Sequence, residues 1–183
     1  MFKSLRILLL TLISLTLISC SVALGGLQSY IDASDGYQFL YPNGWVGVDV
    51  KNSAEGVDVI FRDLIESSEN LSVIISDVSK EQTLTALGSP TEVGYRLLKQ
   101  MNNQSNSNRK ADLINAESRE ADGKTYYTLE YQVTLPNQQE RHNIASISVS
   151  RGKLFTFNLS TVQKRWDKVK ALFETSAKSF SVY

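Results

Sequence analysis

The chain has 183 residues, with 19 Lys and Arg against 19 Asp and Glu, one histidine and one cysteine. This length is typical of a single domain. The balanced charge gives no strongly basic field, which argues against a nucleic-acid partner. A single cysteine excludes an intrachain disulfide and a thiolate metal cluster.

The first 20 residues have the layout of a bacterial lipoprotein signal. Lys3 and Arg6 precede an apolar stretch from 7 to 18, and the run Leu17-Ile18-Ser19-Cys20 follows. We predict a signal peptide at 1–19 and a lipidated Cys20, whose acyl chains would anchor the protein durably. The alternatives are a spanning helix, for which the apolar run is too short, and a secretory signal with a chance cysteine. Cleavage would leave 17 basic and 19 acidic residues, a formal charge of −2.

Residues 20–28 are small and glycine-containing, which predicts a lipidated cysteine and a flexible tether before a domain at 29–183. Apolar residues then alternate with a period of two, which indicates strands at 37–41, 46–50, 57–61 and 71–75. Pro42-Asn43-Gly44 predicts a turn between the first two.

A helix signal interrupts the strands at Ser89. This residue can act as the N-cap, Pro90 suits the first helical position, and Glu92 completes a capping box. Apolar residues recur at 93, 97 and 101 along one helix face. The polar run 102–108 has no periodicity and predicts a mobile loop.

The second half again alternates, with strands predicted at 111–120, 127–133, 143–149 and 155–159. Asp122-Gly123 is a hairpin signal. Thr161 is predicted to cap a last helix that carries Trp166, Val169 and Phe173 on one face, before a short extended piece at 179–183. Short turns favour antiparallel pairing. We therefore predict an α+β domain, with one antiparallel sheet of about six strands and helices packed on it.

The sequence offers little for catalysis. It has no Gly-x-Ser-x-Gly elbow, no glycine-rich phosphate loop and no His-Glu-x-x-His motif. A nucleophile normally needs a base beside it, and His142 is the sole histidine. We expect no enzyme.

Weak metal binding has two candidate sites. Glu140 and His142 share one side of a strand, and Glu130 on the partner strand could lie opposite His142, which would suit Zn²⁺ or Mn²⁺. We favour the simpler interpretation of a half-buried histidine paired with a carboxylate. Asp32 and Asp35 could contact Ca²⁺, although aspartates that bond their own turn are commoner.

Several segments resemble the PsbP family, the extrinsic proteins of photosystem II, over essentially the whole mature domain. The most specific is Tyr30 to Trp45, an Asp-Gly-Tyr-x-Phe-x-Tyr-Pro-x-x-Trp run. The other similar segments are Asp122 to Tyr131, Arg141-His142, Gly152 to Thr156, Trp166 and Ser179-Phe180. The lipoprotein signal is similar to that of the cyanobacterial branch of this family.

The resemblance implies an α/β/α sandwich around an antiparallel sheet, on the lumenal side of the thylakoid membrane. It implies association with photosystem II core subunits and the oxygen-evolving complex, in assembly, repair or stability, with no catalytic residues. We expect a monomer anchored by its lipid. The short segment 21–28 departs from the extended N-terminal segment of plant members, which puts direct ion retention in doubt. The alternative function is a lumenal lipoprotein that binds Mn, Ca or Zn, with His142 as a contact implied by the resemblance.

Overall fold

The computed structural model describes residues 26–50, 56–103 and 108–183. The predicted signal peptide, Cys20 and most of the predicted tether lie outside the described residues, as does most of the predicted loop at 102–108. In the part of the chain that is described, no helix is long and apolar enough to cross a membrane.

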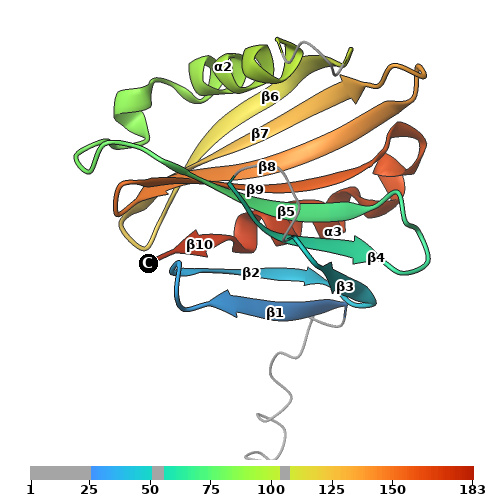
Figure 1. Cartoon of the computed structure of the whole chain (residues 1–183), viewed down its shortest axis with the longest axis horizontal. Helices are drawn as coiled ribbons and strands as arrows, with labels where there is room; N and C mark the ends of the chain where they lie inside the picture. Colours follow the sequence, from blue (N-terminus) through green and yellow to red (C-terminus); the bar gives the residue numbers. More distant parts are fainter. Residues whose placement is uncertain (1–25, 51–55, 104–107) are drawn as a thin grey trace, which may run out of the picture.

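Two antiparallel sheets form the core of the fold (Figure 1). The small sheet has the order β1-β2-β10, with the bounds β1 Leu27–Asp32, β2 Tyr37–Pro42 and β10 Ser181–Val182. The large sheet has the order β3-β4-β5-β9-β8-β7-β6. Its strands are β3 Trp45–Val48, β4 Val57–Asp63, β5 Asn70–Asp77, β6 Lys110–Ala121, β7 Lys124–Thr134, β8 Glu140–Ser150 and β9 Lys153–Val162.

The large sheet is covered on both faces. Helix α2 (Pro90–Asn102) packs on β6 and β7, whereas α3 (Trp166–Ser179) packs on β8, β9 and β2 on the other side (Figure 1). Two short 3₁₀ helices, η1 (Thr85–Leu87) and η2 (Gln163–Arg165), precede α2 and α3. The α+β class with helices on both sides of an antiparallel sheet is confirmed. The main sheet has seven strands among the described residues, close to the predicted six, and the separate three-stranded sheet was not predicted.

Alternation along the strands separates two apolar cores. On β7, Tyr126 points to the α3 side, where it joins the cluster that contains Phe39, Phe157 and Phe173. Its neighbour Tyr127 points to the α2 side, with the cluster that contains Leu98, Leu129 and Ile147. Successive strand residues face opposite sides of a sheet, so one strand serves both cores. This double coverage explains why β8 and β9 are buried along most of their length.

The helix signal at Ser89 is confirmed, because the side chain of Ser89 accepts a hydrogen bond from the Glu92 amide and Pro90 opens α2. The cap predicted for the last helix is wrong. Thr161 is a buried residue of β9, and its hydroxyl donates to Glu69 Oε1 at 3.3 Å. The chain makes the turn η2 before α3 begins at Trp166.

The N-terminal boundary also differs from the predicted one. Strand β1 begins at Leu27, inside the segment predicted as tether, and Leu27 pairs with Pro42 of β2. The paired structure of the domain therefore begins at residue 27, two residues before the predicted start at 29. Strand β3 ends at Val48, earlier than the predicted strand at 46–50.

Candidate functional site

His142 lies in a cluster of four side chains at the start of β8, which we call the histidine cluster: Glu130, His142, Gln163 and Trp166. His142 Nε2 is 2.7 Å from Glu130 Oε1, and Nδ1 is 2.9 Å from Gln163 Oε1. The imidazole stacks on Trp166, with ring centroids 3.8 Å apart. Only 4% of His142 is exposed. A metal ion could bind this ring only by replacing one of its two hydrogen bonds.

The strand register explains which residues meet. Gln132 pairs directly with His142, and Glu130 pairs with Ile144, so Glu130 reaches the ring diagonally along one face. Glu130 therefore contacts His142, as the sequence predicts. It does so from a diagonal position, and Gln132 is the residue directly opposite His142.

Glu140 lies apart from this contact. Its side chain is exposed and lines an open depression of about 390 Å³ with Gln163, Lys164 and three other residues. Among the described residues, the group of His, Cys, Asp and Glu side chains close enough to hold a metal ion does not include His142, Glu130 or Glu140. The geometry of the histidine cluster is that of a buried histidine paired with a carboxylate, the interpretation favoured from the sequence, and the convergence of all three residues that a metal site would need is not seen.

That metal-capable group is instead Asp32, Asp35 and Asp58, which we call the acidic turn. Each offers one carboxylate oxygen, and these atoms lie within 4.8 Å of one another. Asp32 is the last residue of β1, Asp35 lies in the β1–β2 turn, and β4 contributes Asp58. Carboxylate oxygens are the ligands that Ca²⁺ and Mn²⁺ prefer.

Each carboxylate of the acidic turn also has a protein partner. Asp32 Oδ1 accepts hydrogen bonds from the Ser34 and Asp35 amides, both at 2.9 Å. The Asp35 amide contributes most to lowering the pKa of Asp32. The buried Tyr37 hydroxyl donates to Asp58. Burial and then this hydrogen bond raise the pKa of Tyr37. The turn is therefore held by its own hydrogen bonds.

Two cations close over the same turn. Lys153 Nζ is 2.6 Å from Asp35 Oδ1, and Arg151 donates to the Asp35 carbonyl oxygen. Asp35, Asp58 and Lys153 line an open depression of about 280 Å³ that also includes Asp77. A divalent cation there would compete with the Lys153 ammonium for Asp35.

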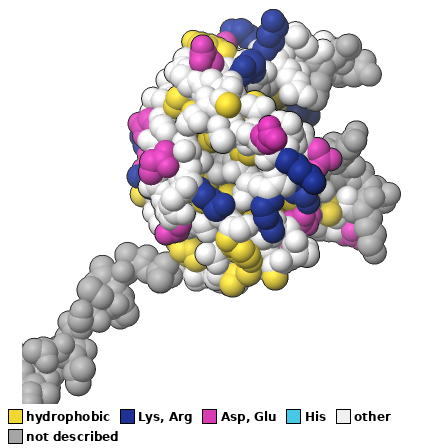
Figure 2. All heavy atoms as spheres, turned by 90° about the vertical axis from the view of Figure 1, so that its left-hand side faces the viewer, with side chains coloured by type: hydrophobic (Ala, Val, Ile, Leu, Met, Phe, Trp, Pro, Cys, Tyr) yellow, Lys and Arg dark blue, Asp and Glu magenta, His cyan; other side chains and the backbone are white. Residues whose placement is uncertain are grey.

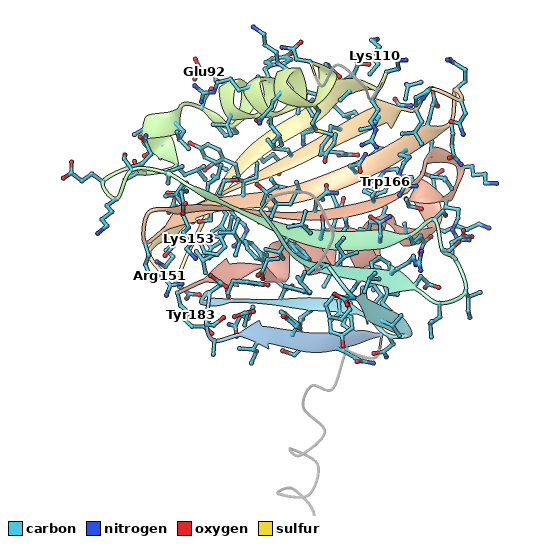
Figure 3. The ribbon with its side chains drawn as sticks, in the orientation of Figure 1. Glu92, Lys110, Arg151, Lys153, Trp166 and Tyr183 are labelled. Carbon is cyan, nitrogen blue, oxygen red and sulfur yellow. The ribbon has the colours of Figure 1, made fainter. Side chains whose placement is uncertain are left out.

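The histidine cluster and the acidic turn occupy opposite ends of the molecule. Figure 3 labels Arg151, Lys153 and Tyr183 at one end of the sheet and Trp166 toward the other. The Tyr183 hydroxyl donates to the Asp32 carbonyl oxygen at 3.2 Å, which places the last residue on the acidic turn. Figure 2 faces this end and shows charged side chains of both signs close together.

Sequence reasoning missed Asp58 and Gln163. Asp58 is 23 residues from Asp35, and only the pairing of β4 in the large sheet beneath the small sheet brings it near. Gln163 lies in η2, where the sequence predicts the first turn of the last helix. Neither residue stands in a motif that could have marked it.

Comparison with known proteins covers nearly the whole chain. A family model described as PsbP matches residues 25–182. A protein named CyanoP from Synechocystis sp. is 57% identical over 178 residues, which span 97% of this chain and 95% of that protein. CyanoP from Thermosynechococcus vestitus is 51% identical and covers 90% of both chains.

Solved structures agree with the fold. The solution structure of cyanobacterial PsbP (CyanoP) from Synechocystis sp. superposes with a TM-score of 0.75 at 58% identity, over 92% of this chain and 99% of that one. The Ran-binding protein Mog1p of Saccharomyces cerevisiae has a TM-score of 0.57 over 85% of this chain and 95% of that one, but only 7% identity, so it shares the fold alone.

Proposed function

This chain belongs to the PsbP family, and we propose that it is a lumenal extrinsic protein that associates with photosystem II and is held at the thylakoid membrane by a lipid on Cys20. The similarity to CyanoP over 97% of the chain carries the proposal. A relative from Arabidopsis thaliana named photosynthetic NDH subunit of lumenal location 1, 28% identical over 84% of this chain and 61% of that protein, supports the lumenal location.

The role that we propose is support of photosystem II assembly, repair or stability through binding, without catalysis by this chain. The histidine cluster agrees with this role, because both nitrogens of the sole imidazole are engaged in hydrogen bonds. A general base must reach a substrate proton, and this ring is 4% exposed.

A detergent pull-down from native membranes tests the proposal. The tagged full-length protein should recover photosystem II core subunits, and a Cys20→Ala version should recover fewer, because an anchor raises the local concentration of a weak partner. Recovery of NDH subunits alone would reassign the partner. Recovery of no photosynthetic complex would contradict the proposal.

A second candidate function is binding of a divalent cation, Ca²⁺ or Mn²⁺, at the acidic turn. The observation that favours it is the approach of three carboxylates within 4.8 Å. Two of these residues, Asp32 and Asp35, were predicted from sequence as oxygen donors. Calorimetric titration of the domain with each cation tests this function. Heats equal to those of diluting the cation into buffer would contradict it.

A further inference from the structure

The hairpin that joins β4 to β5 presents two adjacent apolar side chains to solvent. Leu64 is 69% exposed and Ile65 is 98% exposed, the largest fractions among the large apolar residues of the described chain. Single exposed apolar residues are ordinary, but an adjacent pair at a hairpin tip is a potential contact surface. We call Leu64 and Ile65 the apolar tip.

The apolar tip is held in place from below. Asp63 Oδ1 accepts hydrogen bonds from the amides of Ile65 and Glu66, at 2.6 and 2.7 Å. Arg141 donates to the Ser68 carbonyl oxygen at 2.7 Å. These contacts fix the backbone around the tip. The loop therefore does not need to become ordered before its two exposed side chains can make a contact.

Arg165 offsets part of the negative charge beneath the tip. Its guanidinium is 2.6 Å from Glu69 Oε1 and 3.4 Å from Glu66 Oε2. Pairing with one cation reduces the repulsion between these two carboxylates and an anionic lipid headgroup.

The described chain begins at the end of the molecule that carries this tip. The Gly26 carbonyl oxygen accepts a hydrogen bond from the Asn43 amide at 2.8 Å. Two residues later, Trp45 pairs with Asp63, the residue before the tip. Figure 1 shows the start of β1 at the same end of the molecule as the β4–β5 connection. The apolar tip and the entry point of the chain therefore share one end of the domain.

Chain length then limits how far this end can lie from a lipid on Cys20. Gly26 lies six positions after Cys20, and an extended chain over six positions spans about 20 Å at most. An anchored Cys20 would keep the end that bears the apolar tip next to the bilayer, while the acidic turn at the opposite end would face away.

We propose that Leu64 and Ile65 insert into the lipid surface as a second membrane contact, which orients the domain on the bilayer. This inference rests on the lipid anchor of the proposed function. A lipid anchor and a second, weaker membrane contact on one body reinforce each other through effective concentration.

A fluorescent label at the tip tests the inference. The lipidated full-length chain carrying Ile65→Cys is labelled with nitrobenzoxadiazole and reconstituted on phosphatidylcholine vesicles that contain a doxyl-lipid quencher. Ile114→Cys, on β6, is the matched control because Ile114 is also exposed, at 52%. A lipidated Cys20 has no free thiol, so the label attaches only at the introduced cysteine. We expect a blue-shifted, quenched label at 65 and an unquenched label at 114.

A second variant removes the tip without a label. Leu64→Ser/Ile65→Ser should transfer to empty acceptor vesicles faster than the unmodified protein, by on the order of tenfold for each apolar side chain that leaves the lipid. Ile114→Ser should transfer at the unmodified rate. Circular dichroism confirms that each variant is folded.

The outcomes separate the two proposals. Retention on vesicles with equal quenching at 65 and 114, and an unchanged transfer rate, would overturn the tip inference and leave the anchor standing. If the chain without an introduced cysteine reacts with the label, the thiol of Cys20 is free. That result, together with failure to bind vesicles, would overturn the lipid anchor and the tip inference with it.

Discussion

The imidazole of His142 lies face to face with the indole of Trp166, with centroids 3.8 Å apart and planes only 14° from parallel. The stack joins β8 to the first residue of α3, so it fixes where the last helix begins. Glu130 and Gln163 hold the ring in this orientation through its two nitrogens. The histidine cluster thus ties a central strand to the helix that covers it.

Removal of the ring should therefore destabilise the fold. His142→Ala loses the stack and leaves Glu130 without its partner, and we expect the free energy of unfolding to fall by about 2 to 3 kcal/mol. Urea denaturation followed by tryptophan fluorescence measures this. His142→Gln keeps a polar side chain without the aromatic face and should lose less. An alanine variant as stable as the parent would show that the stack contributes nothing.

Cation binding should depend on the acidic turn and not on the histidine cluster. Asp58→Asn removes one negative charge from the turn and should weaken Ca²⁺ or Mn²⁺ binding by about tenfold. Lys153→Met removes the ammonium that competes for Asp35 and should strengthen binding. His142→Ala is the control and should leave the affinity unchanged in calorimetric titration. Loss of affinity in His142→Ala alone would move the metal site to β8.

Stability should fall at low pH partly through Asp32. Its pKa is lowered below 3.8 in the fold, chiefly by the hydrogen bond from the Asp35 amide. The contribution is present above that value and disappears as the pH falls through the folded pKa. Asp32→Asn keeps an acceptor oxygen without titrating, so its stability should decline less steeply below about pH 4. Urea midpoints measured from pH 6 to pH 2.5 check this, and parallel curves would contradict it.

The capping box at the start of α2 gives a local stability prediction. Ser89 accepts from the Glu92 amide, and Glu92 Oε2 accepts from the Ser89 amide at 2.8 Å. Ser89→Ala should cost about 1 kcal/mol of unfolding free energy, and Ser89→Gly only a few tenths. Chemical denaturation compares them. A Ser89→Ala variant as stable as the parent would mean that the side-chain cap contributes nothing.

Periodicity and turn chemistry predicted much of the fold. The alternating segments became strands, the Asp122-Gly123 hairpin formed with Asp122 at φ 51°, and Ser89 capped α2. What escaped prediction depends on tertiary context. Half of the residues of strand β1 are polar, and the strand forms because β2 offers it an edge. An extended piece was predicted near the C-terminus, but its pairing with β2, which makes it strand β10, was not.

The sites were less predictable than the elements. Glu130 and His142 were placed on neighbouring strands, but the register that makes their contact diagonal depends on the whole β7–β8 pairing. Asp32 and Asp35 were recognised as donors, whereas Asp58 joins them only through the stacking of two sheets. Sequence spacing carries no information about that stacking.

The β1–β2 turn places an evolutionary constraint on one of its own residues, Gly36. Gly36 has φ 73°, and a β-carbon built there would overlap the guanidinium of Arg151, which donates to the neighbouring carbonyl oxygen of Asp35. A side chain at 36 would therefore meet both backbone strain and a steric clash. The left-handed backbone at 36 should therefore keep glycine there among descendants of this chain, whereas the exposed and flexible Arg151 side chain can move aside.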